Sequence, residues 1–403
     1  MLRPCSVSVT PASSRSSPAE SLNLTEHPLI HFNDGTEDRT ARWRSESGAT
    51  PPKRVEVADD TMTADSAYRL AAEGTALLWR SDFQNARQLL QALMRRIDRP
   101  RKVRRKQAEP DATPGAAFHR HRQAQAQRAH TLSMLLIPME ADYGIPLSRA
   151  PDVRLACSEA WGAPGGEASV TSLRELLGLI GAHEWRKKGV DVPALGAHIH
   201  PYYGVFAPIR SEYVKLVSQA TLPAQTLAFD IGTGTGVLAA VLAKRGVAKV
   251  IATETDARAL ACARENISRL GFNGQVEVVE TDMFPEGRAP LIVCNPPWIP
   301  STPSAPIERA VYDAGGKMLR AFLAGLAEHL EPEGEGWLIL SDIAEHLGLR
   351  TREELLALID AAGLKVKSRS EARPMHPKSK DAADPLHAAR SAEITALWRL
   401  VVR

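Results

Sequence analysis

The chain has 403 residues, and its 50 lysines and arginines nearly balance 47 aspartates and glutamates, which leaves a formal net charge of +3. A hydrophobic share of 44% suits a globular protein of two domains, and no apolar run approaches the roughly 18 residues that a membrane-spanning helix needs. The four cysteines lack metal-ligand spacing, which excludes a cysteine-rich scaffold and favours a reducing compartment.

Residues 1–61 are rich in serine, proline, threonine and arginine and show no apolar periodicity. This composition predicts a disordered tail. The first acidic residue is Glu20, so an organellar transit peptide is one alternative, and a native start near Met62 is another. The apolar core of a secretory signal is absent, and we expect a cytoplasmic protein.

The segment from 62 to 195 is predicted to be a helical accessory domain for target recognition. Apolar residues recur at helix-like intervals over 64–72, 76–93 and 118–134. Between the last two stretches, Arg95–Lys106 holds eight basic residues and one acidic residue in twelve positions. This basic cluster has the composition of a nucleic-acid contact, and equally that of a solvated loop.

Two histidine pairs in this half of the chain resemble metal ligands by residue type alone. They are His119 with His121 and His198 with His200. Neither pair has a cluster of further ligands nearby in the sequence, so we expect no metal site.

A strand, a glycine-rich turn and a helix are expected between residues 226 and 244. The turn reads Asp230, Ile231, Gly232, Thr233, Gly234, Thr235 and Gly236. Glycines allow a ligand to approach the backbone closely. A dinucleotide fingerprint would need a further glycine where Val237 stands, so a dehydrogenase is a remote alternative. Asp230 suits a ligand that carries an amino group better than a pyrophosphate.

Two more strands are expected to end near acidic residues. Glu254 follows the strand from Val250 and is placed to accept hydrogen bonds from ribose hydroxyls, while Asp256 caps the next helix. Asp282 follows the strand from Val276 and could accept from an adenine amino group. The carboxyl ends of parallel strands meet at one edge of a sheet, where open α/β folds bind ligands.

The fourth strand of this region leads into the most informative turn of the chain, Asn295-Pro296-Pro297-Trp298. The two prolines make the backbone stiff and extended, and they leave carbonyls free to accept. The Asn295 side-chain oxygen and the Pro296 carbonyl can then point at one donor, beside the flat ring of Trp298. A planar NH2 group fits such a site.

These motifs, FDIGTGTG, VIATETDARALACARENI, TDMFP and IVCNPPW in this order, resemble those of class I S-adenosylmethionine-dependent methyltransferases. They are similar to the Asn-Pro-Pro-aromatic group, which methylates amide or exocyclic amine nitrogens, and within it to release-factor glutamine methyltransferases and the small-domain RNA methyltransferases. The resemblance covers roughly residues 200–403. It implies that the glycine turn holds the amino-acid part of the cofactor, that Glu254 holds the ribose, and that Asp282 and Met283 flank the adenine. The cofactor residues that it implies are Asp230, Gly232, Thr233, Gly234, Gly236, Glu254, Asp282, Met283 and Phe206.

Two segments match these families less closely. Residues 204–212, which include Phe206, are similar to a segment that closes over cofactor and target in both branches. Residues 307–316 are partly similar to a stretch of the glutamine methyltransferases, but a proline and a following Asp-Gly are missing. These departures weaken the glutamine assignment more than the methyltransferase assignment.

The predicted fold is therefore α/β, with an N-terminal helical accessory domain over 62–195 and a seven-stranded Rossmann-like sheet over 196–403. Helices are expected over 318–330 and 351–362, strands over 336–341 and 364–368, and an antiparallel last strand over 393–402. The polar connection over 373–392 is expected to cross the side of the sheet that carries the site.

Four functions follow from this sequence. The leading one is N-methylation of a protein glutamine in the translation apparatus, with Asn295, Pro296, Pro297 and Trp298 as catalytic residues and S-adenosylmethionine as cofactor. The first alternative is methylation of an adenine or guanine amine in RNA or DNA, which the basic cluster and the large face of Trp298 favour. A catalytically silent, cofactor-binding adaptor is the second alternative, and the dehydrogenase is the last.

Overall fold

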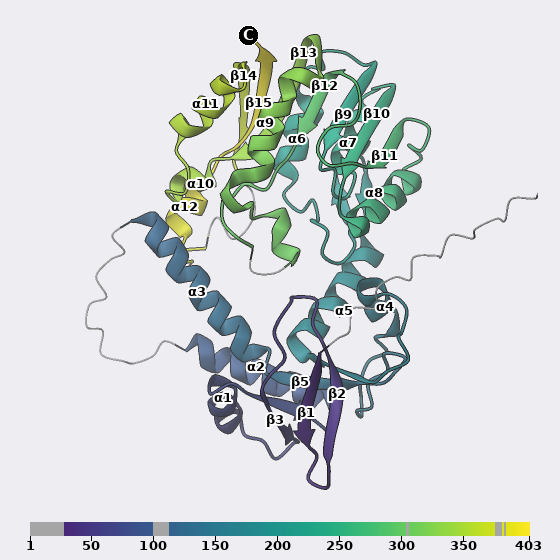
Figure 1. Cartoon of the computed structure of the whole chain (residues 1–403), viewed down its shortest axis with the longest axis vertical. Helices are drawn as coiled ribbons and strands as arrows, with labels where there is room; N and C mark the ends of the chain where they lie inside the picture. Colours follow the sequence, from purple (N-terminus) through teal and green to yellow (C-terminus); the bar gives the residue numbers. More distant parts are fainter. Residues whose placement is uncertain (1–27, 100–112, 304–305, 375–380, 383) are drawn as a thin grey trace, which may run out of the picture.

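Two separate β-sheets organise the chain, one in each of two lobes (Figure 1). The computed structural model describes residues 28–99, 113–303, 306–374, 381–382 and 384–403. We use "N-terminal lobe" for the described residues from 28 to 188, and "C-terminal lobe" for those from 190 to 403.

The C-terminal lobe is built on a seven-stranded sheet with the order β11-β10-β9-β12-β13-β15-β14. Only β15 runs antiparallel to its neighbours, β13 and β14, so the predicted Rossmann-like sheet with an antiparallel last strand is confirmed. The strands are β9 (Leu227–Ile231), β10 (Lys249–Glu254), β11 (Val276–Glu280), β12 (Ala289–Cys294), β13 (Leu330–Ser341), β14 (Leu364–Ala372) and β15 (Thr395–Val402).

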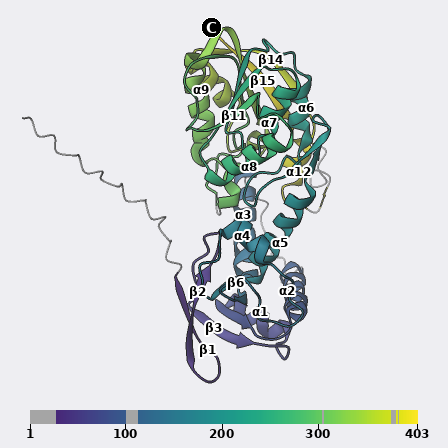
Figure 2. The same cartoon turned by 90° about the vertical axis from the view of Figure 1, so that its right-hand side faces the viewer.

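Helices cover both faces of this sheet, which explains why its central strands β9 and β12 are almost entirely buried (Figure 2). All six residues of β12 are buried. One face packs against α6 (Ser211–Gln219), α7 (Val237–Lys244) and α8 (Ala257–Arg269). The other face packs against α9 (Lys317–His329) and α11 (Arg352–Ala361).

The N-terminal lobe is an α/β unit, so the prediction of a helical domain is wrong. Its six strands lie in the order β1-β2-β6-β5-β4-β3, with parallel and antiparallel pairs. They are β1 (Leu29–Asn33), β2 (Asp38–Arg44), β3 (Arg54–Ala58), β4 (Thr75–Trp79), β5 (Leu135–Met139) and β6 (Ser169–Ser172). The helices are α1 (Ala64–Ala72), α2 (Phe83–Asp98), α3 (Pro114–Leu132), α4 (Arg154–Trp161) and α5 (Leu173–Lys188).

Two local features explain this error. The run Thr75–Trp79 is buried at every position, and a short apolar run of this kind cannot be told from a buried helix by periodicity. The predicted tail over 1–61 also contains β1, β2 and β3, so that prediction is wrong for residues 28–61. Each of these strands has a single buried side chain, such as Ile30 or Trp43 in the core of the lobe, and its other residues are exposed or half-buried.

The remaining elements are short. A hairpin of β7 (Val190–Val192) and β8 (Ala197–Ile199) begins the C-terminal lobe, directly after α5. Near the sheet edge that carries the site lie η1 (Pro306–Ala310), η2 (Ala314–Gly316), α10 (Ile343–His346) and α12 (His387–Ala392). Among the described helices, none combines the length and apolar character needed to cross a membrane.

The lobes touch on two sides of a central space (Figure 1). On one side, the start of α3 reaches α10 and α12, where Phe118 is buried against Ile343, Leu347 and Leu386. On the other side, Arg186 of α5 forms an ion pair of 2.8 Å with Glu265 of α8. The C-terminal ends of β9, β10 and β12 face the space between these two contacts.

Candidate active site

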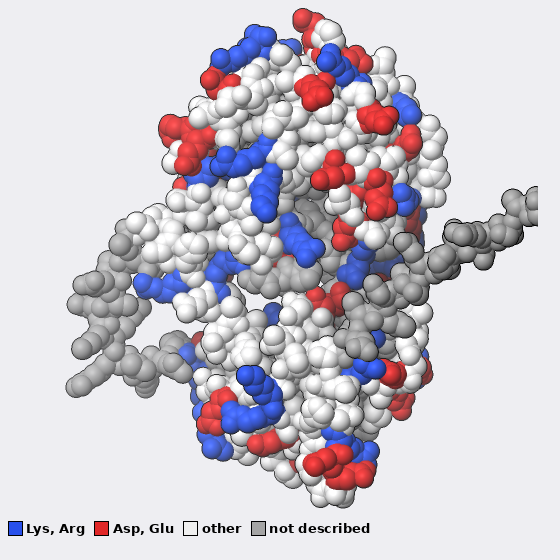
Figure 3. Space-filling model, in the orientation of Figure 1, with Lys and Arg blue, Asp and Glu red and all other residues white. Residues whose placement is uncertain are grey.

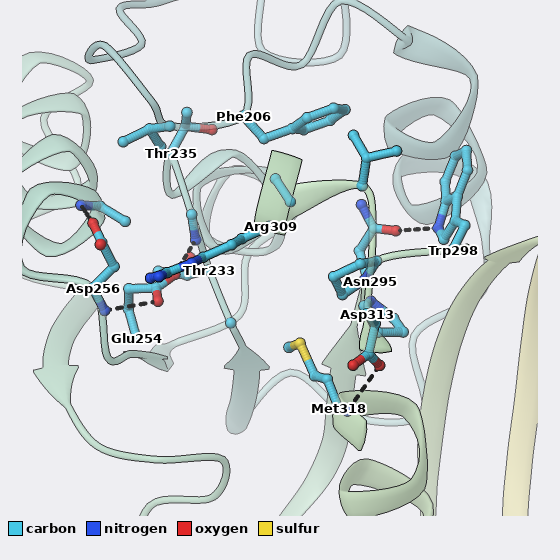
Figure 4. Close-up of a pocket in the computed structure, with 18 of the residues that line it drawn as sticks. Phe206, Thr233, Thr235, Glu254, Asp256, Asn295, Trp298, Arg309, Asp313 and Met318 are labelled. Carbon is cyan, nitrogen blue, oxygen red and sulfur yellow. Dashed lines mark hydrogen bonds between the residues drawn. The ribbon is translucent and has the colours of Figure 1, made fainter. Parts of the chain in front are cut away.

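A cavity of about 1040 Å³ lies at the C-terminal ends of the parallel strands. Figure 3 shows the surface hollowed between the two lobes, and Figure 4 shows the side chains that line the cavity. The N-terminal lobe contributes Glu46 and Ser47 to the wall. Every residue predicted for the cofactor or for catalysis lines this cavity except Gly236, and these are Phe206, Asp230, Gly232, Thr233, Gly234, Glu254, Asp282, Met283, Asn295, Pro296, Pro297 and Trp298.

The glycine turn between β9 and α7 needs its glycines for their backbone conformation. Gly232, Gly234 and Gly236 have φ angles of 68°, 58° and 80°, which other residues rarely adopt. A Cβ on Gly232 would lie 2.4 Å from the Met318 methyl, whereas a Cβ on Gly234 would meet nothing within 4 Å. The turn therefore presents bare backbone to the cavity at Gly234.

Asp230, at the end of β9, is buried, and one of its two carboxylate oxygens accepts hydrogen bonds within the chain. Its Oδ2 accepts hydrogen bonds from Thr233 Oγ1 (2.6 Å) and from the Ala239 backbone N–H (3.0 Å). No bond to Oδ1 is present among the described residues, so that oxygen is available to a ligand in the cavity. Burial, with a smaller effect of Glu254, raises the pKa of Asp230 to about 6.

Glu254 is fixed in place at the end of β10 (Figure 4). Its Oε2 accepts from the Gly234 N–H (3.1 Å), and its Oε1 accepts from the N–H groups of Thr255 (2.9 Å) and Asp256 (3.1 Å). Asp256 caps α8 by accepting from the Ala259 N–H, as predicted. The carboxylate therefore links the glycine turn to the start of α8 and faces the cavity between them.

The segment after β11 is held by a contact that sequence reasoning missed. Met283 has a φ of 60°, which is unfavourable for a side chain of this size. The hydroxyl of Thr253, a fully buried residue, donates to the Met283 carbonyl at 2.7 Å. Asp282 is exposed beside it and lies two residues beyond the end of β11.

The Asn-Pro-Pro-Trp turn follows β12 and carries an internal hydrogen bond. The Trp298 Nε1–H donates to the Asn295 Oδ1 at 2.9 Å, so one lone pair of the amide oxygen is already used. Pro296 is buried, which fixes the turn against the sheet. The sequence indicated the acceptors of this turn but not the donor that orients one of them.

Arg210 connects the predicted closing segment to this turn. Its guanidinium lies 4.9 Å from the centre of the Trp298 ring, donates to Glu212 at 2.8 Å and donates to Glu393 at 2.9 Å. Ser341, at the end of β13, also donates to Glu393 at 2.6 Å. No signal in the sequence pointed to Arg210, because two of its partners, Trp298 and Glu393, lie far from it in the chain. Phe206, in the same closing segment, packs against the core of the C-terminal lobe.

A second unforeseen residue, Asp313, joins the turn to α9. Its carboxylate accepts from the backbone N–H groups of Lys317 and Met318 at 2.9 Å each. Its own N–H donates to the carbonyl of Ile299, which follows Trp298 directly. The start of α9 and the Asn-Pro-Pro-Trp turn are thereby held in one arrangement.

The other sequence features bear on the site less. Part of the basic cluster, residues 100–106, lies outside the described residues. His198 and His200 line no part of the cavity, and no group of three metal-ligating side chains occurs in the described part of the chain. Burial raises the pKa of Cys262 to about 12 and that of Cys294 far above its ordinary value, so neither thiol is a nucleophile at neutral pH.

Comparison with known proteins gives a family for part of the chain. Residues 213–352 match the family model described as the methyltransferase small domain. This range contains the glycine turn, Glu254, Met283 and the Asn-Pro-Pro-Trp turn.

Three relatives represent the range of similar proteins. The chain is 34% identical over 170 residues to a release factor glutamine methyltransferase of Cereibacter sphaeroides, which is 38% of this chain and 58% of that protein. It is 29% identical to a tRNA1(Val) (adenine(37)-N6)-methyltransferase of Bacteroides thetaiotaomicron, over 34% of this chain and 62% of that protein. It is 33% identical to a ribosomal protein L11 methyltransferase of Pelotomaculum thermopropionicum, over 39% of this chain and 44% of that protein. The match thus spans about half the length of these relatives.

Proposed function

We propose that this chain, which carries a methyltransferase small domain at residues 213–352, is an S-adenosylmethionine-dependent N-methyltransferase. The observation that carries the proposal is that the glycine turn and the Asn-Pro-Pro-Trp turn line one cavity. The glycine turn offers the Asp230 carboxylate and bare backbone to the cavity. The Asn-Pro-Pro-Trp turn offers carbonyl acceptors to the same cavity.

The cofactor residues fit the groups of S-adenosylmethionine. The free Oδ1 of Asp230 suits the ammonium of the amino-acid part, and the positive φ at Gly234 lets the backbone approach it. The carboxylate of Glu254 suits the ribose hydroxyls. The segment of Asp282 and Met283 suits the adenine edge. When bound, the cofactor supplies a methyl group that its sulfonium charge has activated.

The chain then has to align a nitrogen rather than move protons. Asn295 Oδ1 and the Pro296 carbonyl accept from the target NH2 group and orient its lone pair toward the methyl carbon, which is catalysis by orientation. The same acceptors favour the positive charge that develops on the nitrogen. The target proton leaves after transfer, so no histidine or lysine base is required at the turn.

A protein amide is the target that the geometry favours. The Trp298 ring is half-buried, packs against three core clusters and lies beside the Arg210 guanidinium. It therefore offers an edge and a limited face, which suits a side-chain amide better than a stacked base. The similarity to a release factor glutamine methyltransferase supports the same class of target.

An exocyclic amine of a nucleic-acid base is the second candidate. Helix α3 carries three arginines and three histidines and no acidic residue, and its start lies beside the site. A cationic helix at this place favours a phosphate-bearing target.

Acid hydrolysis of the labelled product separates the two targets. The purified chain is incubated with methyl-labelled S-adenosylmethionine and cell extract, and the macromolecular product is hydrolysed in strong acid. A methylated amide releases its label as volatile methylamine, whereas a methylated base amine keeps it on the base. We expect volatile label. Label that stays on a base contradicts the amide target, and no transfer at all contradicts the proposed activity.

A further inference from the structure

Helix α3 extends from the N-terminal lobe to α10 and α12 of the C-terminal lobe (Figure 1). Its Phe118 belongs to a buried cluster against which Trp298 of the Asn-Pro-Pro-Trp turn also packs. Phe118 and Arg122 are four residues apart, so they lie on one face of the helix. Phe118 is buried in the contact between the lobes, and its ring centre lies 6.5 Å from that of Tyr312. Because Phe118 is fixed in this contact, the position of Arg122 relative to the C-terminal lobe is fixed as well.

Arg122 contacts both ends of the loop that follows the catalytic turn. We call this the return loop and define it as residues 299–303 and 308–313. The guanidinium donates to Ser301 Oγ (3.0 Å) and the Thr302 carbonyl (2.8 Å) at one end, and to the Glu308 carboxylate (3.0 Å) at the other. It also lies 4.2 Å from the centre of the Tyr312 ring.

These contacts are shielded from water, which strengthens them. The Arg122 side chain is only 16% exposed and the Glu308 side chain 35%. A guanidinium can bridge several acceptors in one plane, which the ammonium of a lysine cannot. Arg122 thus holds the two ends of the return loop together, which an exposed surface ion pair would not do.

The return loop is hydrogen-bonded to the residue that follows the Asn-Pro-Pro-Trp turn, so the contacts of Arg122 affect the position of that turn. Ile299, directly after Trp298, donates to the Val311 carbonyl at 3.2 Å and accepts from the Asp313 N–H at 2.9 Å. Val311, Tyr312 and Asp313 line the cavity, and Asp313 fixes the start of α9 beneath it. The direction of Trp298, and through its indole N–H that of Asn295, therefore depends on the return loop.

We propose that Arg122 is a positioning residue for methyl transfer, and that the N-terminal lobe thereby completes the target side of the active site. Arg122 touches neither cofactor nor target; it acts through the return loop on Trp298 and Asn295. The catalytic part of this inference rests on the proposed function, whereas the ordering of the return loop by Arg122 does not.

The test compares full-length Arg122→Ala with a matched control, Arg128→Ala. Arg128 lies on the same helix and pairs with Asp98 inside the N-terminal lobe, at 2.8 Å and 2.9 Å. Amide hydrogen exchange is measured for peptides covering 299–303 and 308–313, with peptides of the glycine turn at 230–236 as internal reference. Binding of S-adenosylhomocysteine and the kcat and KM of transfer to the labelled extract fraction are measured in parallel, together with Arg122→Lys.

Arg122→Ala is expected to speed exchange in the return loop and to lower kcat on the order of 100-fold, because a small displacement of aligned groups has an effect of that size. Exchange at the glycine turn and the affinity for S-adenosylhomocysteine stay unchanged. Arg122→Lys restores part of the kcat, and Arg128→Ala behaves like the wild type.

Return-loop exchange and kcat within twofold of wild type in Arg122→Ala would overturn the proposal, and so would an equal effect of Arg128→Ala. If the wild type transfers no methyl group, the proposed function has failed. In that case the exchange data still decide whether Arg122 orders the return loop.

Discussion

The amide oxygen of Asn295 has two lone pairs, and the indole N–H of Trp298 occupies one of them. The bond holds the side chain in one orientation, with its remaining lone pair available beside the Pro296 carbonyl. An aromatic residue at position 298 is therefore useful in two ways, as an apolar wall and, in the case of tryptophan, as a donor.

Replacing Trp298 by Phe tests the second role. The ring keeps an apolar face, but the donor is lost and the Asn295 amide is free to rotate. Because a hydrogen bond of this kind contributes about 1 kcal/mol, we expect kcat to fall roughly five- to tenfold. The dissociation constant of the cofactor, measured by calorimetry, should not change. A variant with unchanged kcat would show that the indole N–H has no part in positioning Asn295.

The binding role that we propose for Asp230 carries a cost in stability. Its pKa of about 6 lies above the ordinary aspartate range, so the folded chain holds a proton on this group more tightly than the unfolded chain. Stability therefore falls as pH rises from the ordinary aspartate range to about 6. Above that pH the buried carboxylate is charged, and this is the form that we propose binds the ammonium group of the cofactor.

Asp230→Asn separates the two effects. At pH 8 the variant should unfold at a higher denaturant concentration than the wild type, and this difference should vanish near pH 4. Its affinity for the cofactor should be lower at pH 8. In the wild type, affinity should weaken roughly tenfold between pH 7 and pH 5, as the carboxylate gains its proton. A pH-independent affinity between these values would contradict the assignment of Asp230 to the ammonium group.

At the scale of elements, the ends of β9, β10, β11 and β12 bring the site together, and this much could be predicted. The apolar runs of β9, β10 and β12 each lead to a polar residue, and parallel strands align their carboxyl ends. The helix after β9 was predictable from its apolar pattern, and the helix after β10 from its pattern and its Asp256 cap. The fold of the C-terminal lobe therefore follows from local sequence.

What could not be predicted depends on residues far apart in the chain. Thr253 and Met283, Arg210 and Glu393, or Arg122 and Ser301 have no shared local pattern, since each pair meets only when the sheet and the lobes are assembled. The strands of the N-terminal lobe escaped prediction for a related reason. Short buried runs and half-polar edge strands take their structure from neighbours rather than from their own periodicity.

Thr253 supports the part of the cavity wall formed by Met283, from within β10. Thr253→Val keeps the shape of the side chain but removes the hydroxyl that holds the Met283 carbonyl. We expect a loss of about 1 kcal/mol in unfolding free energy and, as the Met283 backbone relaxes from its positive φ, about fivefold weaker cofactor binding. Urea unfolding and calorimetry measure the two quantities. Thr253→Ser, which keeps the hydroxyl, is the control, and equal binding by the valine and serine variants would contradict this account.

At the scale of the whole molecule, residues of both lobes line the cavity. Arg258 of α8 donates to the Ala160 carbonyl at 2.7 Å and pairs with Glu46 at 3.3 Å, so the loop that contains Glu46 and Ser47 is anchored beside the start of α8. Phe118 anchors the opposite side. The two contacts flank the cavity and couple its shape to the relative position of the lobes.

Phe118→Ala should uncouple the lobes. Removal of a buried phenylalanine costs about 3–5 kcal/mol, and here the loss falls on the contact between the lobes. We expect scanning calorimetry to show the lobes unfolding in separate transitions. Phe83→Ala is the matched control, because Phe83 is equally buried but lies in the core of the N-terminal lobe, where its loss should lower the stability of that lobe alone. Indistinguishable melting profiles for the two variants would argue against coupling through α3.

We propose that the Asn-Pro-Pro-Trp turn positions an amide nitrogen of a protein for methyl transfer from S-adenosylmethionine. To test this, the purified full-length chain, or Asn295→Ala, is incubated with radiolabelled S-adenosylmethionine and cell extract, and one half of the product is treated with RNase and the other with protease. We expect the wild type to give label that protease removes and RNase does not, and Asn295→Ala to lose this label although it still binds the cofactor. Equal labelling by Asn295→Ala would contradict the site, and label that disappears with RNase would contradict the protein target.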